Sequence, residues 1–274
     1  MFINLALDKL FATKPSLTVQ QGDHFDHIQK YPLFMSTAGY GHFINSTYPI
    51  TYHTGDSSHI HWTFQLLPYI WSEAQRCVKH SQPVMRSMIF DWQHDPSAYT
   101  ISDQFMLGEH LLFVPIVSEH NQRNVYLPEG GWLDYWTNSV YHGPRWLEVE
   151  AKLDELPIFI RAGAVVPLAD IIQHTGTFDW QHLTLDICPG GENRFVVMPP
   201  HKEPVVVICR QVPEQLVVTI ELGAMRYTLR LRAIGQPKQV SVDGKHAAWT
   251  EDNDTIEVSV PSSEGPCTII VEYT

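Results

Sequence analysis

The second half of the chain alternates between apolar and polar positions. Beyond residue 178, eight short runs rich in β-branched residues are separated by Pro and Gly turns at near-regular spacing. The runs are HLTLDIC, NRFVVM, PVVVICR, QLVVTIEL, RYTLRLR, QVSVDGK, TIEVSV and CTIIVEY. This pattern is typical of a β-sandwich. In TLRLR we expect Leu229 and Leu231 to point inward and the arginines outward, and VDGK at 242–245 predicts a hairpin.

A second group of apolar runs lies between residues 103 and 168, punctuated by Gly-Gly, Pro and Asn. We expect strands near 110–117, 123–127, 132–136, 146–150 and 156–166. Together they predict a smaller antiparallel sandwich. The glycine pairs at 130–131 and 190–191 are interpreted as hairpin turns.

The spacing of apolar residues changes over residues 65–90. Apolar residues recur at helical spacing through LLPYIWSEAQRCVKH and predict a helix over 65–79, with Pro68 in its first turn. The run VMRSMIF at 84–90 is nearly continuous and apolar, which favours a buried parallel strand. Upstream, residues 31–55 predict two or three short antiparallel strands.

The composition indicates a folded, acidic protein. Of 274 residues, 44% are hydrophobic and 11% aromatic, and the formal net charge is −12. This charge disfavours nucleic acid and anionic membranes as partners, and it suits neutral ligands. The N-terminus lacks a basic region, and no apolar run reaches about 18 residues, so we expect no signal peptide, no membrane span and a cytoplasmic location.

Four scattered cysteines favour buried thiols in a reducing compartment, because they form no CxxC pair and no metal-ligand spacing. They are Cys77, Cys188, Cys209 and Cys267.

Two polar groups could bind a metal. The DHFDH run at 23–27 contains two Asp and two His, and His59 and His61 would share one face of a strand. Neither group has a further ligand beside it, so ordinary loop and strand surface are the favoured interpretations, and we expect no metal and no cofactor. Asn45-Ser46-Thr47 matches the glycosylation sequon, and turn formation is its favoured role.

Between residues 66 and 168 several blocks follow one another in a fixed order: LLPYIW, PVMRS, QFMLGEHLLFVPIV, YLPEGGWLDYWTN and LPIFIRAGAVVPL. This series closely resembles glycoside hydrolase family 31, the α-glucosidases, α-xylosidases and their relatives. Ser87 stands where the family usually has Pro, and Glu109 where it usually has Asp. The segment 31–55 resembles the family's N-terminal β-sandwich, and 178–274 resembles its distal C-terminal β domain in pattern.

The resemblance implies where the chemistry of the family lies. A (β/α)₈ barrel of about 250 residues separates the N-terminal sandwich from the LLPY helix, and it carries the two catalytic Asp residues. Here the LLPY helix begins directly after Phe64. We therefore expect an internally deleted or truncated relative that lacks most of the barrel and has no catalytic residue, with its substrate-binding residues unassigned. The intact relatives would hydrolyse neutral α-linked oligosaccharides or glycosides.

Three acids lie at positions where a catalytic residue could be expected. Asp91, Asp95 and Asp103 follow the predicted 84–90 strand, and barrel enzymes place catalytic groups at such strand ends. Retaining glycosidases need two carboxyl groups about 5–5.5 Å apart. For these three acids, capping or turn formation is the favoured role. Asp134 stands in a Trp-Leu-Asp context, but its block resembles the C-terminal sandwich.

Five aromatic residues could form a sugar-stacking platform, although burial in the sandwich core is the favoured interpretation. They are Trp132, Tyr135, Trp136, Tyr141 and Trp146.

The sequence thus predicts a mainly β chain with two C-terminal antiparallel β-sandwich domains, an N-terminal β-sandwich remnant and a helix–strand remnant of a barrel. The expected limits are 1–64, 65–110, 111–172 and 178–274. Two functions stay open: a family 31 fragment that is inactive alone, and a non-catalytic carbohydrate-binding or scaffolding module. Loss of the barrel should expose an apolar patch that permits self-association. Its expected members are Trp71, Met85, Met88 and Phe90.

Overall fold

The computed structural model describes 65–115, 122–150, 156–170, 179–221, 225–252, 254–262 and 265–273. It also places the backbone of two short strands, β1 (Leu33–Met35) and β2 (Gly41–Phe43). These two pair antiparallel, which confirms strands in the 31–55 segment. The DHFDH run, Asn45, His59 and His61 lie outside the described residues.

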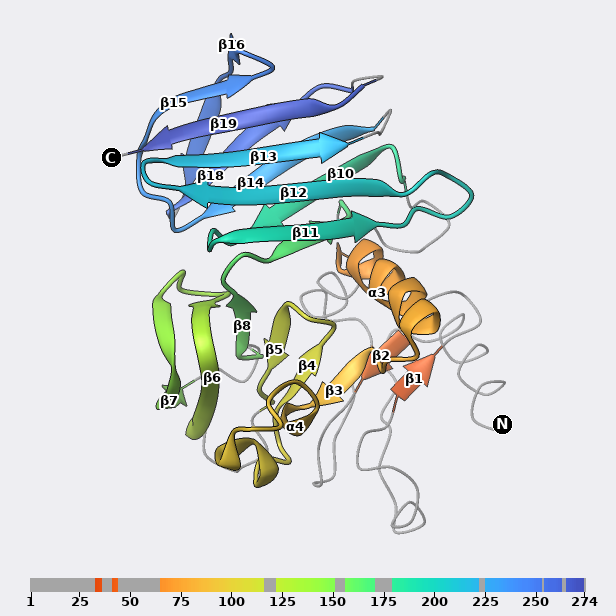
Figure 1. Ribbon diagram of the computed structural model, residues 1–274, viewed down its shortest axis with the longest axis vertical. Helices are drawn as coiled ribbons and strands as arrows, with labels where there is room; N and C mark the ends of the chain where they lie inside the picture. Colours follow the sequence, from red (N-terminus) through yellow and green to blue (C-terminus); the bar gives the residue numbers. More distant parts are fainter. Residues whose placement is uncertain are drawn as a thin grey trace, which may run out of the picture.

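The C-terminal half is a sandwich of a five-stranded and a six-stranded sheet (Figure 1). The first sheet has the order β17 (Trp249–Asp252), β18 (Thr255–Val260), β14 (Arg226–Arg232), β10 (His182–Ile187) and β9 (Val165–Leu168). The second has the order β11 (Glu192–Val197), β12 (Val205–Val212), β13 (Gln215–Glu221), β19 (Cys267–Tyr273), β15 (Pro237–Val242) and β16 (Lys245–His246). All eight predicted runs form strands, and pairing is antiparallel except between β10 and β14.

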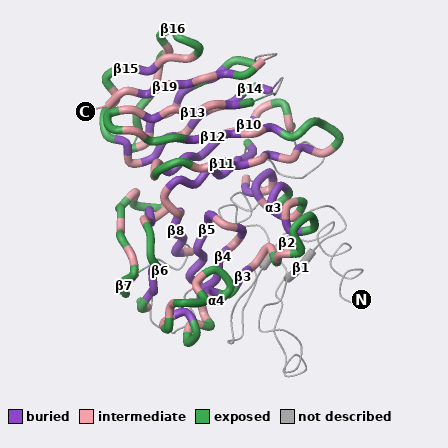
Figure 2. Tube along the Cα trace, viewed as in Figure 1, coloured by how far each residue is buried: buried purple, intermediate pink, exposed green. Residues whose placement is uncertain are grey.

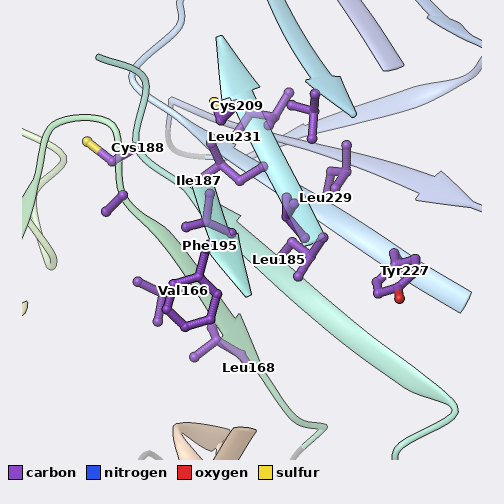
Figure 3. Close-up of a cluster of buried hydrophobic side chains, with 14 of the residues drawn as sticks. Val166, Leu168, Leu185, Ile187, Cys188, Phe195, Cys209, Tyr227, Leu229 and Leu231 are labelled. Carbon is purple, nitrogen blue, oxygen red and sulfur yellow. The ribbon is translucent and has the colours of Figure 1, made fainter. Parts of the chain in front are cut away.

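Side chains that alternate along these strands fill the space between the two sheets. Leu229 and Leu231 are fully buried beside β10 side chains, as the TLRLR pattern predicts (Figure 3). The outward placement of both arginines is wrong for Arg232, which is buried because Asp186 on β10 pairs with it. The VDGK hairpin is confirmed: Val242 pairs with Lys245, with the left-handed turn residues that such a turn needs.

The middle of the chain forms a six-stranded antiparallel sheet, here called the proximal sheet. Its order is β3 (Met85–Ser87), β4 (Phe105–Leu107), β5 (Leu111–Phe113), β8 (Ile158–Arg161), β6 (Gln122–Asp134) and β7 (Val140–Glu150). The predicted parallel strand at 84–90 is wrong. β3 is short and pairs antiparallel with β4, and the chain then turns into the helix α4 (Met88–Asp91) and, further on, a 3-10 turn (Pro96–Tyr99).

Neither glycine pair forms a hairpin turn. Gly130 and Gly131 lie inside β6, where the register with β7 shifts, so one long strand replaces two predicted ones. Gly190 and Gly191 connect β10 to β11 in the opposite sheet. A Cβ on Gly190 would lie 2.6 Å from the backbone nitrogen of Gly163, so the close approach of two turns requires this glycine.

The helix α3 (Leu67–His80) confirms the predicted helix and lies between the proximal sheet and the C-terminal sandwich (Figure 1). Pro68 occupies its first turn, where its missing N–H leaves no helical bond unmade. At the other end, Ser81 adopts a left-handed conformation and its N–H donates to the carbonyl of Cys77. Lys79 and His80 in the last turn complement the helix dipole.

One continuous core joins α3, one face of the proximal sheet and the sandwich (Figure 2). The opposite face of the proximal sheet has a separate core beneath α4 and the Pro96–Tyr99 turn. The described part of the chain is mainly β, as predicted, and contains no closed barrel. β9 pairs with β10 although it lies before residue 172, and the four domain limits stay a prediction. No helix in the described ranges is both long and apolar enough to cross a bilayer.

Candidate functional site

Charged side chains from four places in the chain meet beside α3. Glu73 and Arg76 come from the helix, Arg86 from β3, Asp91 from the end of α4 and Glu109 from the β4–β5 turn. We call these five residues the carboxylate–arginine network. Arg76 contacts Glu73 at 2.6 Å and Glu109 at 2.5 Å, and Arg86 contacts Asp91 at 3.2 Å. Longer contacts join Arg86 to Glu109 at 3.8 Å and to Glu73 at 4.0 Å.

The centre of the network is removed from water. The side chains of Glu73 and Arg86 are 1% and 2% exposed. Burial raises the pKa of the Glu73 carboxyl, and the hydrogen bond from Arg76 acts in the opposite direction. Burial alone would lower the pKa of Arg76, but its hydrogen bonds and charge interactions with Glu73 and Glu109 hold that pKa above the ordinary value. Removing one member of this network would leave an uncompensated charge in the interior.

A neutral hydrogen-bonded chain lies next to the network. The Tyr69 hydroxyl donates to the carbonyl of Leu107 at 2.8 Å and accepts the His110 backbone N–H at 3.2 Å. His110 Nδ1 lies 3.2 Å from the carbonyl of Val165, and its Nε2 lies 3.3 Å from Asn193 Nδ2. This geometry assigns the proton to Nδ1, with Nε2 as the acceptor.

Burial lowers the pKa of His110 to about 4, so the ring is neutral at pH 7. The chain of contacts ties α3 and the β4–β5 turn to β9 and β11, which belong to the two sheets of the sandwich.

The three acids with a positional claim to catalysis all have structural partners. Asp91 pairs with Arg86 at 3.2 Å, and Asp103 pairs with Arg123 at 2.6 Å. Asp95 accepts the Ser97 N–H at 2.9 Å, which caps the following turn, and it also accepts the Tyr126 hydroxyl. That none of them is catalytic stays a prediction, which these contacts favour.

Asp134 has a local role as well. Its Oδ1 accepts the backbone N–H groups of Trp136 and Thr137 at 2.8 and 2.9 Å. This arrangement closes the turn between β6 and β7 and explains the Asp without catalysis.

The five candidate aromatic residues do not form one platform. Trp132 is 1% exposed in the core, whereas Trp136 and Trp146 are 46% and 54% exposed. Trp136 packs edge-on against Tyr135, and its indole N–H donates to the carbonyl of Leu156 at 2.7 Å. The expectation of core burial is therefore correct for Trp132 and wrong for Trp146, on β7, and for Trp136, in the turn after β6, because both side chains lie at the surface.

A cavity of about 490 Å³ opens beside Trp146. The loop before β4, the start of β6 and β7 line it through Thr100, Ile101, Ser102, Asp103, Gln122, Arg123, Asn124 and Trp146. The described residues contain no cluster of three or more side chains suited to a metal ion.

Only part of the carboxylate–arginine network could be found in the sequence. Glu73 and Arg76 are three residues apart on a predicted helix, a spacing at which opposite charges meet. Arg86 and Glu109 lie in separate blocks, and nothing in their local pattern connects them.

Comparison with known proteins agrees with this architecture. Residues 81–166 match the glycosyl hydrolase family 31 C-terminal domain. The chain is related to glycoside hydrolase family 31 through its C-terminal β regions. The resemblance stated from the sequence is thereby confirmed.

Two curated relatives show how far this family 31 relationship extends. The chain is 33% identical over 142 residues to alpha-glucosidase 2 of Bacillus thermoamyloliquefaciens, an alignment covering 51% of this chain and 18% of that protein. It is 31% identical over 150 residues to an alpha-xylosidase of Saccharolobus solfataricus, covering 54% and 20%. The chain therefore matches about a fifth of the length of these relatives.

A solved dextranase from Flavobacterium johnsoniae shares the fold. The superposition covers 78% of this chain and 32% of the dextranase chain, with a TM-score of 0.73 and 22% identity.

Proposed function

We propose that this chain supplies the C-terminal β support of a family 31 glycosidase architecture and does not hydrolyse glycosides by itself. Relatives that share these β regions are named for α-glucoside and α-xyloside substrates. A complete protein carrying the same regions would act on α-linked glycosides. The observation that carries the proposal is that Asp91, Asp95 and Asp103 are each engaged in a structural contact.

The electrostatics of Glu73 support the same proposal. A retaining glycosidase pairs an ionised carboxylate with a carboxylic acid of raised pKa about 5–5.5 Å away. Glu73 has a raised pKa, but it is 1% exposed and its Oε2 lies 2.6 Å from Arg76. A general acid must reach the glycosidic oxygen, and this carboxyl faces a guanidinium in the interior.

The direct test is hydrolysis of 4-nitrophenyl α-glucoside and α-xyloside by the purified chain. We expect no release of nitrophenol above the buffer rate, while a complete α-glucosidase in the same assay gives the positive control. Turnover that a standard α-glucosidase inhibitor abolishes would refute the proposal. Asp91→Asn and Asp103→Asn would then show whether one of these acids carries the reaction.

A scaffolding role has separate support in the exposed apolar side chains of residues 65–110. Trp71 and Phe90 are each 39% exposed, as predicted, and Val78 is 81% exposed. The expectation is wrong for Met88, which is fully buried because α4 directs it into the core that contains Met106. Met85 is only partly exposed, because it packs against the core that joins α3, the proximal sheet and the sandwich. Where such exposed side chains adjoin one another on the surface, they support a contact with another polypeptide.

We accordingly propose that the chain self-associates through this surface. Sedimentation at increasing concentration should show oligomers that Val78→Glu weakens. Val140→Glu is the matched control, because Val140 is 57% exposed on β7. A monomer at all concentrations, or equal effects of both variants, would contradict self-association.

The proposed location is the cytoplasm. All four cysteines are buried and free of disulfides, which supports a reducing compartment. Cell fractionation with an antibody against the chain tests this proposal, and recovery outside the cytoplasmic fraction would refute it.

A further inference from the structure

We propose that the cavity beside Trp146 is a binding site for a neutral sugar. The inference places sugar binding at one of the exposed aromatic residues, Trp146, and names the class of ligand. It concerns binding alone, so it holds or fails independently of the hydrolysis assay.

The Trp146 ring is exposed and held in position. It is 54% exposed and lies opposite Tyr126 on the neighbouring strand, with ring centroids 5.1 Å apart. Tyr126 is itself fixed, since its backbone N–H donates to Gln104 Oε1 at 3.0 Å and its carbonyl accepts from Gln104 Nε2 at 2.6 Å. The Tyr126 hydroxyl donates to Asp95. An indole that packs against Tyr126 and is about half exposed offers apolar ring surface to the flat apolar face of a ligand.

Polar groups lie on the same side of the sheet as this ring. Gln122 and Asn124 precede Tyr126 by four and two residues, so the period of a strand places them on one face. Both line the cavity, together with Ser102 of the facing loop. Amide and hydroxyl groups beside an indole match a pyranose ring, which has an apolar face and a rim of hydroxyl groups.

The size of the cavity suits such a ligand. Its volume of about 490 Å³ falls in the range of about 300–1,000 Å³ that small-molecule sites occupy.

The charges around the cavity favour a neutral ligand over a charged one. Arg123 pairs with Asp103 at 2.6 Å and donates to the carbonyl of Asp103 at 3.0 Å, so its charge is already compensated. An anionic sugar would also meet Glu148 and Glu150, which pair with Asn124 and Gln122 across the strands. Asp103 and Arg123 are the charged residues of the cavity lining, and because they pair with each other, neither offers an uncompensated charge to a charged ligand.

The test follows the indole N–H resonance of Trp146 by NMR while isomaltotriose is added to the full chain. Trp146→Phe identifies the resonance by its loss. We expect a saturable shift by about 10 mM sugar, where even a Kd of about 1 mM gives near-saturation. Calorimetry should then show at least a roughly tenfold weaker Kd for Trp146→Ala, while Trp146→Phe keeps most of the affinity through its ring.

Trp136→Ala is the matched control, because Trp136 is similarly exposed but lies outside the cavity lining. It should bind as the unaltered chain does, and the thermal midpoints should show that all variants are folded at the temperature of the titration. A flat titration, an equal loss in Trp136→Ala, or tighter binding of choline or glucose 6-phosphate than of isomaltotriose would overturn the proposal.

Discussion

Replacing Arg232 by Met should destabilise the chain far more than replacing its neighbour on the same strand. Arg232 Nε and Nη2 donate to the two Asp186 oxygens at 2.6 and 2.8 Å. Its Nη1 donates to the Tyr135 carbonyl at 3.0 Å and to Asn138 Oδ1 at 2.9 Å. The Asp186 side chain is 1% exposed. Without Arg232 an uncompensated carboxylate stays buried, which costs about 3–5 kcal/mol.

Arg230→Met is the control for that change. Arg230 pairs with Glu257 at 3.0 Å, but the two side chains are 29% and 42% exposed, so the pair is screened by water. Its loss should cost about 0–1 kcal/mol. Urea unfolding followed by circular dichroism measures both values, and the thermal midpoint of Arg232→Met should fall by about 6–20 °C.

A double variant separates the charge effect from lost packing. Arg232→Met combined with Asp186→Leu replaces the buried pair by apolar side chains and should recover most of the lost free energy of unfolding. Two results would refute the reasoning: equal costs for Arg232→Met and Arg230→Met, or no recovery in the double variant.

Three further predictions concern single buried sites. Tyr227 is 3% exposed, and its hydroxyl has no hydrogen-bond partner among the described residues. Tyr227→Phe should therefore raise the free energy of unfolding in urea by about 1 kcal/mol. A lower free energy of unfolding would show that the hydroxyl has an unseen partner. The folded-state pKa of His110 is about 4, below the value of about 6.5 in the unfolded chain. Between pH 6.5 and 4 the unfolded chain therefore binds more protons than the folded chain. The free energy of unfolding should fall by about 3 kcal/mol as the pH is lowered through that window. His110→Gln should remove this slope, and equal slopes in both proteins would contradict the assignment. A Cβ on Gly108 would overlap the Tyr69 hydroxyl, whereas one on Gly244 meets nothing, although both glycines have positive φ. Gly108→Ala should therefore lower the thermal midpoint more than Gly244→Ala, and the reverse order would be evidence against this packing.

The strands of the C-terminal sandwich were predictable because each strand buries one face and is bounded by turns that contain Pro or Gly. A period of two with β-branched residues is a local signal, and Leu229 and Leu231 follow it. Arg232 follows the same alternation yet is buried, because its partners lie on β10 and in the turn after β6. A local sequence pattern cannot indicate a partner that is distant in the sequence.

The errors around β3 and β6 have a related cause. A continuous apolar run fits a buried strand or a buried short helix equally well, and VMRSMIF contains both. Gly130 and Gly131 have the composition of a turn, but β6 continues through them with a register shift. Among the candidate acids, the expected capping role is found for Asp95, whose partner Ser97 is close in sequence. Asp91 and Asp103 instead form ion pairs with Arg86 and Arg123, which the local pattern did not predict.

The contacts at the junctions explain why residues 65–110 are energetically part of the β regions. Leu66 and Tyr69 share one core with Leu133 of the proximal sheet and with Leu229 of the sandwich. The polar groups at these junctions are satisfied across element boundaries, as when the Met198 N–H donates to Ser72 at 3.0 Å. Breaking any one junction would expose both apolar surface and buried polar groups, so the elements are coupled in unfolding. A barrel joined to α3 and β3 would therefore rest on a base whose geometry is already fixed.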